Sequence, residues 1–315
     1  MKNLIIIIIS SITLLGCVKH NVSLHTKEKV EQDIRNLALE YGGIIGAAAK
    51  NFNTGETIFV NADSLFSEGS FGPTASVIKL AILVELFSQA KSKEVDLQKY
   101  VIVHDSIKVG GAGVLQNFDG DTKIKLIDAA TLMIILSDNT ATNIVIDQLG
   151  KEHDEKLNAV NNQMTSLGLE NTKLLNKVFS YATKKNTYES KRFGLGFSSP
   201  MDMLMLLEKI YHHKIIDSSF SEQIISIMKN QHDDSMIRRY LPYGESISVA
   251  NKTGAVDQSR IDVGIIYSTK ADIGIAIFTD LSKETQWTHD NKAQNAVAKA
   301  ARMIYKYFTR PILEE

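Results

Sequence analysis

The chain has 315 residues, of which 44% are hydrophobic and 23% are charged, a composition typical of globular proteins and unlike that of disordered or fibrous ones. Its formal net charge is −1, so the chain has no excess of basic residues, and this argues against nucleic acid as a partner. The single cysteine, Cys17, excludes a disulfide within the chain and a metal site built on several cysteines, and we expect no metal or cofactor.

The beginning of the chain has the pattern of a secretory signal peptide. A basic residue precedes an apolar run over 4–15, which is shorter than the roughly 20 residues that span a bilayer. The tetrad Leu-Leu-Gly-Cys ending at Cys17 resembles the lipobox of bacterial lipoproteins, in which the peptide is cut before a cysteine that carries the lipid. We expect a signal peptide over 1–16 and a lipid-anchored tether over 17–26, on an exported protein that faces the periplasm. An ordinary signal peptide that happens to contain cysteine is the alternative.

The rest of the chain predicts an α/β fold of the α+β type, in which strands from both ends form one antiparallel sheet. Terminal helices flank this sheet, and an all-helical lobe is inserted between its strands. We expect an α/β lobe over 27–72 and 215–312, a helical lobe over 73–214, and a ligand site in the cleft between them. Residues 171–199 are expected to be irregular. The predicted strands are Ile44–Lys50, Thr57–Asn61, Ser246–Lys252, Arg260–Tyr267 and Asp272–Thr279, and the predicted helices are Lys27–Tyr41, Ser76–Ala90, Lys125–Leu136, Thr140–Leu149, Glu155–Leu167, Pro200–His212, Ser221–Lys229 and Lys292–Phe308.

Three short motifs carry the candidate chemistry, and the first is the Ser-x-x-Lys pattern of Ser76 and Lys79. A serine hydroxyl becomes a good nucleophile when a neighbouring base takes its proton, and positions i and i+3 of a helix share a face. A preceding proline and threonine predict that Ser76 lies in the first helical turn, where developing negative charge is favoured. The same spacing follows Ser88 and Ser226 but lacks a helix start, and a plain N-cap serine is the alternative interpretation of Ser76.

The second motif, the Ser-Asp-Asn triplet of Ser137 and Asn139, lies between two apolar helices. It is either a capping turn or a site where Ser137 relays a proton to a leaving nitrogen and Asn139 binds a substrate amide.

The third motif, Lys252-Thr253-Gly254, is predicted at the end of a strand. It either closes a turn or supplies a cation from Lys252, a carboxylate contact from Thr253, and close access to the strand backbone at Gly254.

In this order, the motifs resemble those of class A β-lactamases and of the wider penicillin-binding superfamily of serine hydrolases. Ser137 follows Ser76 by 61 residues, and Lys252 follows Ser137 by 115 residues, which fits the family. The resemblance extends over nearly the whole mature chain. It implies a β-lactamase/transpeptidase-like fold and an enzyme that opens β-lactam rings through an acyl-enzyme.

The resemblance also implies roles for individual residues. Ser76 is the acylated nucleophile and Lys79 its proton acceptor, while Ser137 and Lys252 form the proton relay and the pair that attracts a carboxylate. Backbone N–H groups of Ser76 and of the residue after Gly254 make an oxyanion hole, a device that typically contributes a few kcal/mol. Arg260 helps to bind the substrate carboxylate or is simply a surface residue of its strand. The implied substrate-binding residues are Asn139, Thr253, Gly254, Ala255 and Arg260.

One departure limits the activity that we expect. Class A β-lactamases carry a loop glutamate, in a Glu-x-x-Leu-Asn pattern, that positions the water which frees the acyl-enzyme. The corresponding stretch over 174–181 lacks this pattern, and no spacing supports Glu170 or Glu189 in its place. Because deacylation needs a base for water, we expect competent acylation followed by slow deacylation, or a non-standard base.

Other functions stay open on the sequence alone. The missing glutamate favours a D-alanyl-D-alanine peptidase that penicillin acylates, whereas the Ser-Asp-Asn triplet and the size of a single catalytic domain favour a β-lactamase. An esterase of the same superfamily and a lipid-anchored binding protein with a degenerate site are further alternatives. The expected partner is a small β-lactam or a peptidoglycan peptide, and we expect a monomer.

Overall fold

The computed structural model describes residues 26–62, 72–244 and 246–311. The predicted signal peptide, Cys17 and almost all of the predicted tether lie outside this described part. Within it, none of the helices combines the length and the apolar character that crossing a membrane requires.

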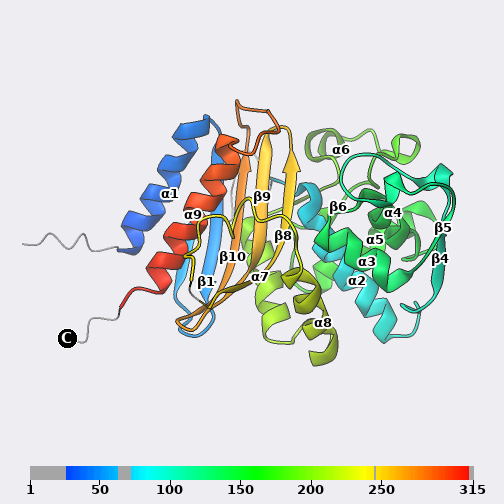
Figure 1. The fold of residues 1–315 in the computed structure, drawn as a ribbon, viewed down its shortest axis with the longest axis horizontal. Helices are drawn as coiled ribbons and strands as arrows, with labels where there is room; N and C mark the ends of the chain where they lie inside the picture. Colours follow the sequence, from blue (N-terminus) through cyan, green and yellow to red (C-terminus); the bar gives the residue numbers. More distant parts are fainter. Residues whose placement is uncertain (1–25, 63–71, 245, 312–315) are drawn as a thin grey trace, which may run out of the picture.

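The predicted antiparallel sheet is confirmed, and it has five strands (Figure 1). Along the sheet they follow the order β2 (Thr57–Val60), β1 (Ile44–Asn51), β10 (Asp272–Asp280), β9 (Ser259–Tyr267) and β8 (Ser248–Val256). Of the two N-terminal strands, β1 pairs with the C-terminal strand β10, in a register that sets Ala47 opposite Ile277, and β2 pairs with β1. This arrangement leaves β8 as an edge strand on the side of the inserted helices.

Two terminal helices, α1 (Lys27–Tyr41) and α9 (Lys292–Phe308), pack together on one face of the sheet (Figure 1). The Thr26 hydroxyl caps the start of α1, and Gly42 ends it at a φ of 68°. Side chains along β10 point alternately to the two faces of the sheet. Its isoleucines at odd positions join the core under α1 and α9, while Ala276 and Phe278 join the core on the opposite face.

On that opposite face, one hydrophobic core runs from the sheet into the helical lobe. Its centre is α2 (Lys79–Lys91), in which every residue from Lys79 to Phe87 is buried. A helix that is apolar on all sides must be enclosed by other elements. The helices packed against α2 are α3 (Leu126–Ile135), α4 (Asn139–Asp147), α5 (His153–Ser166) and α8 (Ser218–Lys229), while α7 (Pro200–Tyr211) packs on β1 and β10 of the sheet.

The structure differs from the predicted elements in two places that matter for the site. Ser76 lies on a short 3₁₀ turn, η1 (Ala75–Ile78), and not in an α-helix, because Ala75 enters the turn at a φ of 46°. Strand β8 continues to Val256, so the Lys-Thr-Gly motif lies within the strand and not at its end.

Short elements were also missed, since a few residues carry too little periodicity to reveal them. The stretch over 171–199, expected to be irregular, contains α6 (Tyr188–Phe193) and two strands of a small sheet. The missed strands are β3 (Gly72–Pro73), β4 (Tyr100–Val103), β5 (Thr122–Lys125), β6 (Lys173–Leu174) and β7 (Gly196–Ser198).

Candidate active site

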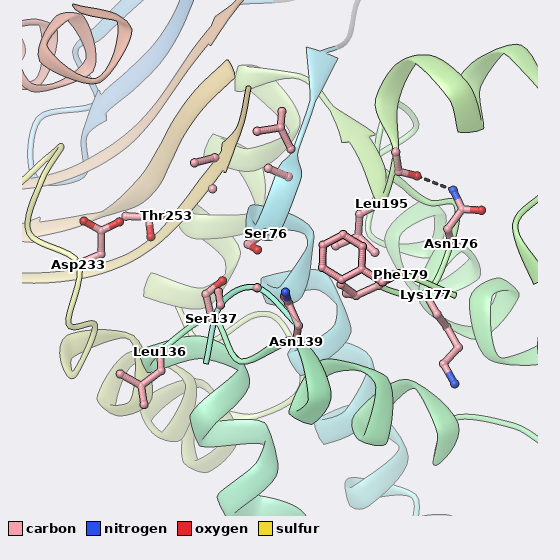
Figure 2. Close-up of a pocket in the computed structure, with 18 of the residues that line it drawn as sticks. Ser76, Leu136, Ser137, Asn139, Asn176, Lys177, Phe179, Leu195, Asp233 and Thr253 are labelled. Carbon is pink, nitrogen blue, oxygen red and sulfur yellow. Dashed lines mark hydrogen bonds between the residues drawn. The ribbon is translucent and has the colours of Figure 1, made fainter. Parts of the chain in front are cut away.

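The three motifs meet at a cavity of about 1120 Å³ (Figure 2). It lies between the edge strand β8, the η1 turn, the start of α4 and the loop over 174–195. Lys79 and Lys252 lie beneath its surface, with fully buried side chains. The candidate residues that line the cavity are Ser76, Ser137, Asn139, Thr253, Gly254 and Ala255.

Gly254 sets the distance between β8 and the turn that carries Ser76. A Cβ at this position would lie 2.6 Å from Thr74 O and 3.1 Å from Ser76 N. Only glycine allows an approach this close. The backbones that carry the two expected oxyanion donors, the N–H groups of Ser76 and Ala255, are therefore brought side by side.

Lys79 is held by the second motif. Its Nζ donates hydrogen bonds to Ser137 O at 2.7 Å, to Ser137 Oγ at 3.2 Å and to Asn139 Oδ1 at 2.9 Å. These acceptors favour the ammonium form, whereas burial and the nearby charge of Lys252 disfavour it. Burial dominates, and it lowers the pKa of Lys79 well below its ordinary value.

Ser137 bridges the two buried lysines. Its Oγ accepts hydrogen bonds from Lys79 Nζ and Lys252 Nζ, each at 3.2 Å. The residue adopts a φ of 54°, a left-handed conformation that is unusual outside glycine and that turns the chain sharply after α3. The hydroxyl thus links a candidate base to a candidate cation.

Polar groups of the sheet and of the loop before β8 surround Lys252. Its Nζ also donates to Thr253 O at 2.7 Å, and burial lowers the pKa of Lys252 to about 8, with Asp233 and Asp262 acting in the opposite direction. Asp262 accepts hydrogen bonds from Asn251 Nδ2 at 3.0 Å and from Ile237 N at 2.9 Å. Burial raises the pKa of Asp262 to about 7.

The middle residue of the second motif has a role that the sequence analysis did not assign. Asp138 caps α4 through Ala141 N, and its other oxygen accepts from Val114 N at 2.7 Å and Leu115 N at 2.9 Å. Asn139 Nδ2 donates to Gly110 O at 3.0 Å, so the glycine-rich rim over 110–113 is fixed to the motif. The interpretation of the Ser-Asp-Asn triplet as a capping turn was the only sequence signal for this connection.

Arg260 does not line the cavity. Its guanidinium donates to three backbone oxygens, those of Val256, Ser259 and Gln286, and lies 4.7 Å from the ring centroid of Trp287. The residue is 2% exposed, which rules out the alternative of a surface arginine. Trp287 itself lines the cavity, so Arg260 supports a wall of the site from behind.

A loop that the sequence analysis left irregular forms the wall opposite β8. Asn143 of α4 fixes this loop, because its amide accepts from Val178 N and donates to Val178 O, both at 2.9 Å. Glu170 and Glu189 are exposed and lie outside the cavity lining. The carboxylates among the described lining residues, Asp233 and Asp257, are on the opposite side, with the loop before β8 and the β8–β9 turn.

The arrangement combines a serine beside backbone donors with two buried lysines and a bridging hydroxyl, which suits acyl transfer to a serine. Among the described residues, no cluster of His, Cys, Asp and Glu is arranged to hold a metal ion.

Comparisons with known proteins agree with this chemistry. The family model described as "Beta-lactamase enzyme family" matches residues 29–308. The chain is 24% identical over 275 residues to β-lactamase BRO-1 of Moraxella catarrhalis, covering 83% of this chain and 82% of that one. It is 23% identical over 316 residues to a β-lactamase of Bacillus licheniformis, covering 96% and 93% respectively.

Solved structures show the same fold. A β-lactamase of Sphaerobacter thermophilus has a TM-score of 0.75 at 24% identity, with 88% of this chain and 96% of that chain covered. A mutant of PBP-A, solved as an acyl-enzyme complex with penicillin G, also has a TM-score of 0.75 at 24% identity, with 90% and 97% covered. Because the family model spans nearly the whole described chain, the protein belongs to the β-lactamase enzyme family.

Proposed function

We propose that this protein is a serine hydrolase that opens β-lactam rings through an acyl-enzyme on Ser76. The observation that carries the proposal is the position of Ser137 Oγ between Lys79 Nζ and Lys252 Nζ, in the cavity that Ser76 lines. The relatives are named β-lactamases, which supports a β-lactam as the substrate.

In the proposed acylation, Ser76 Oγ attacks the carbonyl carbon of the lactam, and its proton passes to the neutral amine of Lys79. The lowered pKa of Lys79 favours this neutral form. As the ring C–N bond breaks, the Ser137 hydroxyl gives its proton to the leaving nitrogen and recovers one from Lys79. The backbone N–H groups of Ser76 and Ala255 stabilise the oxyanion.

Hydrolysis of the resulting ester needs a base for water, and the wall over 174–181 supplies no carboxylate. We therefore propose fast acylation and slow deacylation. The test is intact-mass spectrometry after penicillin is added. We expect a covalent adduct on Ser76 that forms quickly and decays slowly. A wild-type protein that never gains the mass of penicillin, and that hydrolyses none of it, contradicts the function itself.

The lowered pKa of Lys252 predicts how acylation depends on pH. Lys252 is fully protonated well below its pKa of about 8, and the positive charge that attracts the substrate carboxylate is lost as the pH rises through that value. We expect the second-order acylation rate constant to fall about tenfold once the amine is neutral, since hydrogen bonds to charged groups are worth more than neutral ones. The rate is measured from pH 6 to 10.

Two controls isolate the charge of Lys252. The methyl ester of the same penicillin carries no carboxylate, so its acylation should not show this decline. Lys252→Arg keeps its charge far above this pH range, so the decline near pH 8 should disappear even if the absolute rate is lower. An identical decline for acid and ester contradicts the carboxylate role.

We further propose that the protein is one monomeric domain, with 27–72 and 215–312 as its α/β lobe and 73–214 as its helical lobe. We also propose that it is exported and anchored to a membrane by a lipid on Cys17. The Leu-Leu-Gly-Cys tetrad after an apolar run supports the anchor. Replacing Cys17 by serine should move the protein from the membrane fraction to the soluble fraction, and unchanged membrane association contradicts the anchor.

A further inference from the structure

Phe179 has an unusual backbone for an aromatic residue. Its φ is 49°, in the left-handed region that bulky side chains avoid. Ala75 and Ser137, which also have positive φ values, line the same cavity as Phe179. Strained residues of this kind persist where the surrounding structure holds them, and they gather at functional sites. The position of the Phe179 ring therefore needs an explanation in terms of the site.

The helix α4 fixes the chain immediately before Phe179. Asn143 holds both backbone polar groups of Val178 at 2.9 Å, and Lys177 Nζ lies 2.6 Å from Asp147 Oδ2 on the same helix. With two consecutive residues bound to α4, the next residue reaches the cavity by adopting a positive φ.

The ring lies against the same backbone as the amide of Asn139. A Cβ at Gly111 would be 3.2 Å from Phe179 Cε2 and 2.8 Å from Asn139 Nδ2. Phe179 is 53% exposed and lines the cavity that Ser76 also lines. In Figure 2 it stands between Ser76 and the side chains of Asn176 and Lys177.

This geometry matters once Ser76 is acylated. To release the product, a water oxygen must add to the acyl carbon, the bond from that carbon to Ser76 Oγ must break, and Oγ must regain a proton. An aromatic ring occupies the space on the loop side and offers no acceptor for a proton of that water. The neighbouring lining residues Val178 and Leu195 are apolar as well.

We propose that the Phe179 ring shields the acyl-enzyme from water on the loop side of the cavity and so determines how long it persists. The inference rests on the proposed function, because it concerns the fate of the ester on Ser76. Phe179 neither donates nor accepts a proton in this role, and it acts by excluding solvent.

The test compares acyl-enzyme lifetimes after a pulse of benzylpenicillin and removal of the excess. We expect Phe179→Ala to shorten the lifetime about tenfold, and Phe179→Leu to shorten it less, because leucine keeps part of the apolar volume. Hydroxylamine, a small nucleophile, should release the acyl group faster from Phe179→Ala than from the wild type. Tyr188→Ala is the matched control, since Tyr188 is an exposed aromatic residue of α6, outside the cavity lining.

The outcomes separate this inference from the proposed function. A wild-type adduct whose lifetime and hydroxylamine sensitivity are unchanged in Phe179→Ala overturns the shield alone. A wild-type enzyme that deacylates rapidly also overturns it, because the ring then admits water. A wild type that neither forms an adduct nor hydrolyses penicillin overturns the proposed function itself.

Discussion

Ser76→Ala is expected to abolish penicillin acylation and to lower the rate of β-lactam ring opening by at least about 10⁴-fold, because Ser76 carries the hydroxyl that forms the ester in the proposed mechanism. Residual hydrolysis would come from the cavity and its backbone donors alone. The measurement pairs intact-mass spectrometry with hydrolysis of a chromogenic cephalosporin. The wild type gains one adduct, and the variant gains none at the same penicillin concentration.

The sequence contains its own control for this experiment. Ser226 has the same Ser-x-x-Lys spacing but lies exposed on α8. Ser226→Ala should therefore keep the adduct and the wild-type rate. If Ser76→Ala still gains the mass of penicillin, another residue is the nucleophile and the assignment of Ser76 is wrong.

The fold could be predicted from the sequence to a large extent. Strand-like runs predicted β9 and β10 nearly residue by residue, and the helical spacing of apolar residues predicted α1 with its observed bounds, Lys27–Tyr41. These signals are local, since each depends on one element and the face that it buries. The family resemblance depended on the order of three motifs in different elements, and it implied that these motifs meet at one site.

Geometry that depends on contacts between distant segments could not be predicted. Arg260 turns away from the cavity because backbone oxygens of Val256 and Gln286 receive its guanidinium, and nothing in the strand pattern encodes that choice. The hydrogen bonds between Asn143 and Val178 join residues that are 35 positions apart in the sequence. The roles of Ser76, Lys79, Ser137 and Lys252 stay predictions, although the structure brings these residues together.

The charge state of Lys79 gives the second large effect. Lys79→Arg should lower the acylation rate by about 10³-fold, since a positioned general base typically contributes 10²- to 10⁴-fold and arginine does not give up its proton. The fold should persist, because the guanidinium of arginine can still donate hydrogen bonds to Ser137 and Asn139. Thermal unfolding monitored by circular dichroism checks this condition.

The pH profile separates a proton acceptor from a structural cation. A lysine with a lowered pKa is protonated below that pKa and becomes a base above it, so wild-type acylation should include a limb that rises with pH, in addition to the decline caused by Lys252. Arginine titrates far above both values, so Lys79→Arg should lose the rising limb and keep only a low, flat rate there. A structural cation would lower the rate at every pH and leave the rising limb in place. A folded Lys79→Arg variant that retains the rise therefore assigns the proton acceptor to another group.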